Sequence, residues 1–465
     1  MTPEWGSLPL LPLRCVLDHL SMEDAMAAMS TCRHWRTAML LYEGRKEILK
    51  LRVKQRRKAT FLSRIFRRYT RKLHIYLDGN QEELEKFMNC VLPQFFDTVE
   101  LRELIFIGPS YIQQKLRVPL VKLKRVIVES LFFKNVHCME TFALLGCQLD
   151  DANDDGKHMH KKVEYYSRDL LFSRSNFKSV INMDIHNYSS NLRHLIVEYS
   201  EMSTGALVSL EPLQQLRFLT LNLRNKRGVW PQVEWRRVQR QYKSPLQVTL
   251  NIIAVPYRKF DDIIDKVLVD GMNLVSLKVM FCKSLYTGLL AHVARLYRES
   301  LVEVVWVDVP NDSNDPYHRI VRPLRQNQYD QYAPVNPFVL LCWQCVQLRR
   351  LVIHGYWMWH YDLVGFVRLC KTLCQLDVSS VYRKQATFER LAQRSAEGAV
   401  RVMHTDAPAA LDEACVQDIN DFTDFKWEPT SWKCLHPGLR ARSGSAERAD
   451  YVLQEMRRPV ADSLQ

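Results

Sequence analysis

A short apolar phrase recurs along this sequence and constrains its fold more than any other feature. The phrase is one apolar residue, two others, an apolar residue, one other and an apolar residue. Copies at positions 101 and 123, 192 and 216, 274 and 301, and 348 and 373 begin 22, 24, 27 and 25 residues apart. The eight copies are LRELIF, LKRVIV, LRHLIV, LRFLTL, LVSLKV, LVEVVW, LRRLVI and LCQLDV. A period of this length predicts a solenoid of stacked strand-and-connection units.

The phrase and its period are similar to those of a leucine-rich repeat. Segments 203–215 and 284–300 fit the helical interval between two strands, and the second has a clear apolar stripe. The Asn or Cys that usually follows the strand occurs once, as Cys282, so the repeats are degenerate. We assign residues 73–400 to an α/β leucine-rich-repeat-like domain, with insertions at 149–162 and 309–337. A non-repeating α/β domain is the alternative.

In a solenoid, the concave strand face is the usual binding surface. The residues between the buried positions of each phrase are therefore candidate contacts, and most of them are basic, which indicates an acidic target. The candidates are Arg193, His194, Arg217, Lys278, Glu303, Arg349 and Arg350. Four of them, Arg193, Arg217, Lys278 and Arg349, form the predicted substrate-binding set.

The segment from Ser7 to Trp35 has a different pattern, with two helical stripes in succession. Leu8-Pro9 predicts an extended entry, and Pro12 suits a first helical turn. Leu13, Val16, Leu17 and Leu20 then follow at helical spacing. A second stripe and a third short helix carrying Trp35 complete the module. About forty residues cannot bury this much apolar surface alone, so these helices either bind a partner or cap the following domain.

The order and spacing of Leu8-Pro9, Val16-Leu17, Leu20, Asp24 and Cys32-x-x-Trp35 resemble an F-box. We place this module at residues 4–48. It departs from the family pattern at Leu11, where an acidic residue is usual, and at Pro12. F-box proteins often continue into degenerate leucine-rich repeats, so the two parts of the sequence support each other.

The resemblance implies that the module docks onto the Skp-type adaptor of a cullin–RING ubiquitin ligase, with no cofactor and no catalysis by this chain. It further implies that an unknown target protein binds the repeat domain. The residues implied for the F-box core and for adaptor binding are Leu8, Pro9, Leu13, Val16, Leu17, Leu20 and Trp35. Leu8 and Pro9 favour docking because they lie outside the predicted helices, whereas Trp35 favours the core.

Residues 49–72 are rich in Lys and Arg with interspersed apolar residues, and we interpret them as a basic connecting helix. The net charge of +14 is compatible with the same segment binding nucleic acid. The alternative function is therefore a basic, nucleic-acid-associated or chromatin-associated repeat scaffold. No nucleic-acid fold signature accompanies the segment.

Residues 401–465 predict a cap on the last repeat followed, from Arg440, by a largely disordered tail. The sequence has 12 scattered cysteines, no apolar run of transmembrane length and no signal-peptide pattern. These features favour a cytoplasmic or nuclear protein with reduced thiols. Cys342-x-x-Cys345 and Cys370-x-x-x-Cys374 lie in apolar runs, which favours buried thiols over a zinc site.

Overall fold

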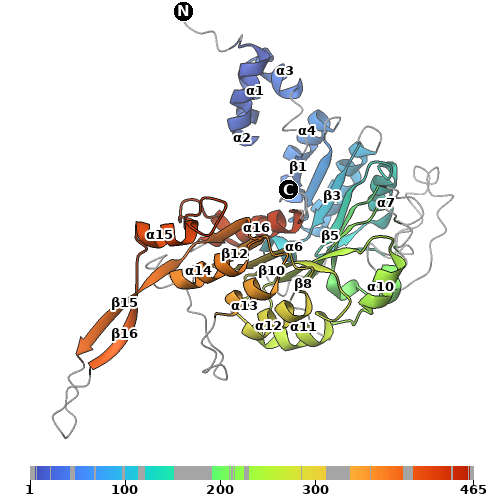
Figure 1. Cartoon of the computed structure of the whole chain (residues 1–465). Helices are drawn as coiled ribbons and strands as arrows, with labels where there is room; N and C mark the ends of the chain where they lie inside the picture. Colours follow the sequence, from blue (N-terminus) through green and yellow to red (C-terminus); the bar gives the residue numbers. More distant parts are fainter. Residues whose placement is uncertain are drawn as a thin grey trace, which may run out of the picture. The chain divides into compact units, whose positions relative to one another are not determined.

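The structure is a computed structural model, and the chain divides into two compact units (Figure 1). Unit 1 comprises residues 1–197 and 209–216, and unit 2 comprises residues 198–208 and 217–465. The described residues are 6, 8–20, 22–41, 48–67, 70–96, 100–113, 121–150, 191–208, 210, 213, 215–224, 230–283, 285–309, 336–356, 358–390, 402–440, 443–458 and 460. The predicted insertions therefore lie outside the described residues, except for positions at their edges.

Three short helices form the amino-terminal part of unit 1. They are α1 (Leu10–His19), α2 (Met22–Thr31) and α3 (Arg33–Leu41). Pro9 precedes α1 with extended backbone angles, as expected for a residue that cannot donate an amide hydrogen bond. Both α1 and α2 contact α3. The predicted three-helix F-box fold is confirmed.

Unit 1 also contains a parallel sheet in the order β1-β2-β3-β5-β7. An apolar row of Leu49, Leu73, Leu104, Phe142 and Leu195 crosses all five strands in register. Each of these side chains is buried. The strands are β1 (Ile48–Arg52), β2 (Lys72–Tyr76), β3 (Glu103–Ile107), β5 (Thr141–Leu145) and β7 (His194–Glu198), and β4 (Val121–Leu123) pairs separately with β6 (Cys147–Leu149). Helical segments separate the strands: η2 (Val53–Gln55), α4 (Arg56–Phe66), α5 (Gln81–Cys90), η3 (Leu92–Phe95), α6 (Pro109–Gln113) and α7 (Arg125–Lys134).

The basic segment differs from the predicted connecting helix. It contains strand β1 as well as helix α4, and β1 pairs in parallel with β2. Leu49 and Leu51 face inward along the strand, while Ala59, Leu62 and Phe66 form the buried side of the helix. The segment is therefore a strand-and-helix unit of the repeating fold. Its positive charge lies mainly on the outer side of α4.

One of the eight apolar phrases is not a strand. LKRVIV ends β4 at Leu123 and then enters α7, whose buried residues include Ile127, Val128, Leu131 and Phe132. The buried residues of α7 follow helical spacing, whereas Val126, the second apolar position of the phrase, is 43% exposed. The strand of this repeat is β5, and the residues that fit the phrase there are METFAL at 139–144, which is not among the eight copies.

Unit 2 contains six parallel strands in the order β8-β9-β10-β11-β12-β14. A second apolar row runs through Leu221, Leu250, Leu277, Val304, Leu351 and Leu376, which are paired in register. The strands are β8 (Phe218–Arg224), β9 (Gln247–Ile253), β10 (Leu274–Met280), β11 (Glu303–Val307), β12 (Arg350–His354) and β14 (Gln375–Val378). An alternating β-α region with a long all-parallel arrangement is therefore confirmed, as in a leucine-rich-repeat-like solenoid.

Helices cover the apolar face of the six strands in unit 2. Trp306 of β11 packs between Phe260 of α11 and Phe338 of α13, with ring centroids 6.4 and 6.2 Å away. Phe338 in turn contacts Phe366 of α14. The helical segments of this unit are η6 (Tyr199–Glu201), α9 (Thr204–Val208), α10 (Trp235–Gln241), η7 (Tyr257–Lys259), α11 (Phe260–Lys266), α12 (Thr287–Leu296), α13 (Pro337–Gln344) and α14 (His360–Leu369).

Among the described residues, those after β14 form two strands and three helical segments, including a 13-residue helix where a disordered tail was predicted. Strands β13 (Met358–Trp359), β15 (Val381–Arg390) and β16 (Val402–Ala409) form a small sheet, followed by α15 (Glu413–Asn420) and η8 (Pro437–Leu439). The amide of Thr430 donates to the carbonyl of Val378, which caps edge strand β14. The predicted disorder beyond Arg440 is wrong for α16 (Ser445–Arg457), whose Val452, Leu453 and Met456 are buried.

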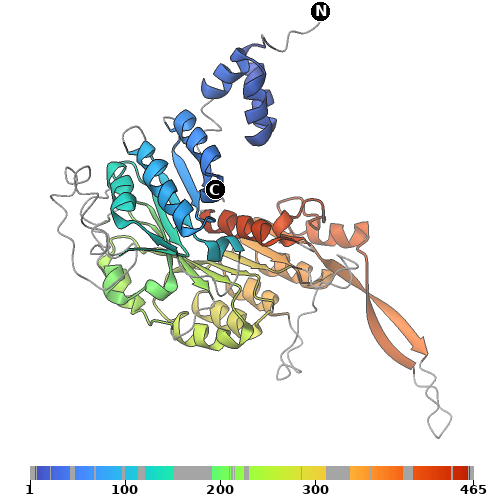
Figure 2. The same ribbon diagram turned by 180° about the vertical axis from the view of Figure 1, so that it is seen from behind.

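Helix α16 lies on the face of the six strands opposite α11–α14 (Figure 1, Figure 2). The two faces differ because side chains alternate along a strand. Leu277 and Val279 point to the helices of the apolar face, whereas Lys278 between them contacts α16. The strand face that the solenoid prediction left open is thus covered around Lys278 by the chain's own helix.

Candidate functional site

The three amino-terminal helices bury a small core and leave other apolar side chains outside it. Leu13 and Leu17 of α1 are fully buried, together with Met29, Ala38 and Met39 from the other two helices. Among the seven residues predicted for the F-box, Leu13 and Leu17 therefore belong to the core. A side chain with no exposed surface cannot contribute contact area to a partner unless the module rearranges.

Leu8 and Pro9 lie directly before α1 and are held in place by backbone contacts. The amide of Leu13 donates to the carbonyl of Pro9 over 3.1 Å. His34 of α3 donates from Nε2 to the carbonyl of Leu8 over 2.7 Å, because a carbonyl oxygen can only accept. The Pro9 side chain is exposed and that of Leu8 is partly buried. The pair is thus fixed in position while keeping apolar surface at the outside.

The first turn of α1 contributes two further exposed leucines. Leu10 is 43% exposed and Leu11 is 73% exposed, the highest value among the exposed large apolar residues of the described chain. Val16, Leu20 and Trp35 are each partly buried, so each has surface in the core of the module and surface outside it. Leu11 departs from the family pattern, but its exposure makes it a candidate contact that the sequence argument missed. The sequence feature that could have identified it is its position directly after Leu8-Pro9.

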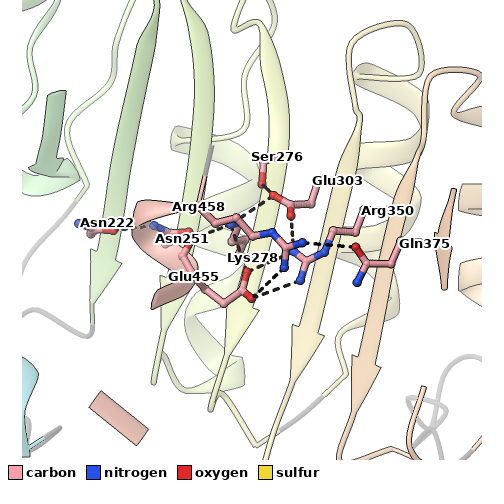
Figure 3. Close-up of polar contacts among 9 residues, drawn as sticks. All are labelled: Asn222, Asn251, Ser276, Lys278, Glu303, Arg350, Gln375, Glu455 and Arg458. Carbon is pink, nitrogen blue, oxygen red and sulfur yellow. Dashed lines mark hydrogen bonds and ion pairs between the residues drawn. The ribbon is translucent and has the colours of Figure 1, made fainter. Parts of the chain in front are cut away.

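In unit 2 the strand face under α16 carries a row of polar side chains, which are buried except for the partly buried Gln375. Ser276, Glu303, Arg350 and Gln375 are paired in register across β10, β11, β12 and β14 (Figure 3). A second row joins Asn222, Asn251 and Lys278, and the amide nitrogen of Asn251 donates to the amide oxygen of Asn222 over 2.8 Å. These rows replace the apolar residues that occupy the other face.

Glu455 of α16 connects these rows by accepting from both buried cations. Lys278 Nζ lies 3.2 Å from Glu455 Oε2 and 2.6 Å from the Glu455 carbonyl oxygen. Arg350 donates to both carboxylate oxygens of Glu455 at 3.2 Å and also pairs with Glu303 (Figure 3). Lys278 and Glu303 are 3.2 Å apart. Two cations and two anions thus balance in a buried four-residue network.

The network changes the pKa of its carboxyl groups. Burial raises the pKa of Glu455, but the charges of Lys278 and Arg350 outweigh burial and lower it to about 2. Burial opposes ionisation of Glu303 in the same way, and the same two cations hold its pKa below the ordinary value. Both carboxylates are therefore ionised at neutral pH. Removing one member leaves an uncompensated buried charge, which is a costly arrangement.

These contacts correct the predicted substrate-binding set. Lys278 has no exposed surface, and Glu303 and Arg350 are also buried, because α16 covers them. Arg217 and Arg349 lie just before β8 and β12. Their carbonyl groups accept hydrogen bonds from the amides of Gln247 and Gln375, which begin the neighbouring strands β9 and β14. Arg193 precedes β7 in unit 1 and is exposed, as is Arg217. The structure therefore does not gather the four basic residues into one open surface.

The cysteines considered as zinc ligands lie mostly in the core. Cys342 and Cys345 are buried, and burial raises the pKa of Cys345 to about 12 and that of Cys342 well above its usual value. The two nearby histidines pair with carboxylates instead: His354 with Asp377 at 3.6 Å, and His360 with Asp418 at 3.5 Å. Within the described ranges, no three His, Cys, Asp or Glu side chains come together as a metal site.

Comparison with known proteins identifies one region of the chain. Residues 5–41 match the F-box domain family, so the chain carries an F-box domain at its amino-terminal side. No curated protein matches the chain. Across the part of the chain that the structure describes, none of the helices is long and apolar enough to cross a membrane.

Proposed function

We propose that this F-box protein is a substrate-recognition subunit of an SCF-type (Skp–cullin–F-box) ubiquitin ligase. The observation that carries the proposal is the match of residues 5–41 to the F-box domain, together with the three-helix fold of the same residues. F-box domains bind a Skp-type adaptor, which links them to a cullin–RING ligase. The chain itself performs no chemistry in this function.

The surface beside α1 supports a docking function. Leu11 and Leu10 are exposed next to Pro9, on a module whose internal core consists of only a few side chains. Burial of a large aliphatic side chain is worth roughly 1.5–3 kcal/mol, so covering these residues with a partner would be favourable. An interface of this composition is expected to be little affected by moderate salt, unlike a phosphate-binding surface.

The strand-and-helix units supply the second half of the function, binding of a target protein. When the adaptor and the target bind one chain, the lysines of the target are held near the ubiquitin-charged enzyme. The rate of ubiquitin transfer then rises through effective concentration, without a catalytic residue in this chain.

The proposal is tested by capture of a purified Skp-type adaptor with the full chain. The variants are Leu8→Ala with Pro9→Ala, and Leu11→Glu. We expect the wild type to retain the adaptor and both variants to lose at least about tenfold in affinity, because interface anchors carry most binding energy. Surface plasmon resonance at 50 and 300 mM salt provides the measurement.

Phe61→Glu is the matched control, since Phe61 is also an exposed apolar residue on a short helix, α4, outside the F-box. This control should bind the adaptor like the wild type. If folded wild-type protein failed to bind the adaptor, the ligase proposal would be wrong, and nucleic-acid binding by the basic segment would become the better hypothesis.

A further inference from the structure

Exposed apolar side chains also occur in unit 2, at the carboxyl-terminal ends of three of its helices. Trp343 is 63% exposed, and Val346, Leu369 and Phe422 are exposed as well. They lie in the last turn of, or just after, three successive helices, α13, α14 and α15. Each of these helices contacts the next. Large exposed apolar groups that cluster in this way mark interaction sites more often than isolated ones do. We call this surface the helix-end strip.

Hydrogen bonds and cation–π contacts link the segments around the helix-end strip. The amide of Val346 donates to the carbonyl of Arg298 at the end of α12, and Thr372 donates its hydroxyl to the carbonyl of Val346, both over 3.2 Å. On the far side of Thr372, the guanidinium of Arg368 lies 4.2 Å from the ring centroid of Phe422. Lys371 Nζ is 5.6 Å from the same ring. These contacts link the turn after α12 to Thr372, and they place Arg368 and Lys371 against the turn after α15.

Basic side chains border the apolar residues of the strip. Arg298, Arg368 and Lys371 are exposed, and the last two make no ion pair within the described chain. A basic residue in the last turn of a helix is favoured by the helix dipole, which accounts for Arg368 by itself. The dipole does not account for the neighbouring exposed tryptophan and leucine. Cations held over an aromatic ring beside apolar surface form a site suited to an acidic ligand with an apolar anchor.

We propose that the helix-end strip binds a short acidic segment of a partner protein, with one large apolar side chain of that segment placed against Trp343 and Leu369. The proposal deepens the function proposed above and rests on it for one point, that the partner is the ligase target. The strand face around Lys278 and Arg350 is already occupied by α16, so a target needs another surface. Charge complementarity selects the acidic segment.

Three fluorescein-labelled peptides test this proposal by fluorescence anisotropy with the full chain. All carry the same Leu and Phe residues, flanked by Asp and Glu, by Ser and Thr, or by Lys and Arg. We expect the acidic peptide to bind at least about tenfold more tightly than the neutral one, and less tightly at high salt. Trp343→Glu with Leu369→Glu should weaken it by at least about tenfold. Arg368→Glu with Lys371→Glu should reverse the preference toward the basic peptide.

Tyr361→Glu is the matched control, because Tyr361 is an exposed aromatic residue at the opposite end of α14. It should leave peptide binding unchanged. Equal binding of the three peptides, no binding of any, or the same loss in the control would overturn the proposal. So would a dimer that Trp343→Glu dissolves, since the strip would then bind a second copy of this chain.

Adaptor capture by the same variants separates the two proposals. The variants of the helix-end strip should bind the Skp-type adaptor like the wild type, because they leave the F-box residues intact. If the wild type captured the adaptor normally but did not discriminate between the peptides, the strip proposal alone would be contradicted. Normal peptide discrimination without adaptor capture would contradict the ligase function alone.

Discussion

Helices α1 and α16 are both short and amphipathic, and they differ in how completely their own chain covers them. Leu13 and Leu17 of α1 are buried, while Leu10 and Leu11 beside them remain exposed. Helix α16 buries Ala449, Tyr451, Val452, Leu453, Glu455 and Met456 along its 13 residues. The comparison shows that an apolar stripe alone does not tell whether a helix serves its own fold or a partner.

What distinguishes α16 is a charged residue on its buried side. Glu455 must reach Lys278 and Arg350 together, so the helix has one position that satisfies all of its partners. Apolar contacts are less directional, and the exposed leucines of α1 fit any complementary apolar surface. Buried ion pairs of this kind can specify a unique arrangement even where their net contribution to stability is small.

The largest expected effect comes from removing one charge beneath α16. Lys278→Ala leaves Arg350 as the one buried cation of the network, beside the more exposed Arg458 at 4.0 Å from Glu455, and it should lower the free energy of unfolding by about 3–5 kcal/mol. Unfolding in guanidinium chloride, followed by circular dichroism, measures the loss. Lys278→Met with Glu455→Met restores the charge balance and should cost less than Lys278→Ala. A loss below about 1 kcal/mol for Lys278→Ala would show that α16 is not held by this network.

An intermediate effect is expected from acid. The pKa of Glu455 is about 2 in the folded protein and has a reference value of 4.5, so ionised Glu455 stabilises the fold above pH 4.5. This contribution, of about 3 kcal/mol, is lost as the pH falls from 4.5 through 2. The difference in unfolding free energy between the wild type and Glu455→Gln should therefore shrink over that range. A constant difference from pH 7 to pH 2 would contradict the assigned ionisation.

The smallest effect on stability is expected at the exposed helix. Leu11→Glu should change the free energy of unfolding by no more than about 0.5 kcal/mol, because the side chain is 73% exposed. The same substitution should abolish adaptor capture, which separates binding from folding. Equilibrium unfolding of the full chain in urea tests the first half of this prediction. A loss above 2 kcal/mol would place Leu11 in the core instead of the interface.

Most of the strand positions in the solenoid could be predicted from the sequence. Seven of the eight phrases overlap strands, because a buried parallel strand needs an apolar residue at alternate positions and at the turn before it. The phrase at Leu123 failed because helix α7 begins two residues later, at Arg125, and leaves Val126 exposed. Strand β5 carries a matching phrase, METFAL at 139–144, that was not among the eight copies, whereas β1, β2 and β9 do not carry the full phrase. A local apolar pattern cannot distinguish a strand from a helix in these cases, because it does not show which strand would pair with the segment.

The binding residues were predicted less well, and α16 is the reason. Lys278, Glu303 and Arg350 do occupy one strand face, as expected, but a helix more than a hundred residues later along the chain covers them. The signal for that helix was present. Ala449, Val452, Leu453 and Met456 are spaced as one helical stripe, and Glu447 accepts from the amide of Gly444 at its start. The charged residues around this stripe make the segment resemble a disordered tail when it is judged by composition alone.

The network beneath α16 also sets an order of events during synthesis of the chain. Glu455 is 177 residues later than Lys278, whose ammonium group it neutralises. At roughly 5–20 residues per second, Lys278 emerges roughly 10–35 s, and Arg350 roughly 5–21 s, before Glu455 is synthesised. During that interval β10 and β12 have both cations but only Glu303 as an anion. Lys278 and Arg350 therefore lack one of their two carboxylate partners until α16 has been synthesised.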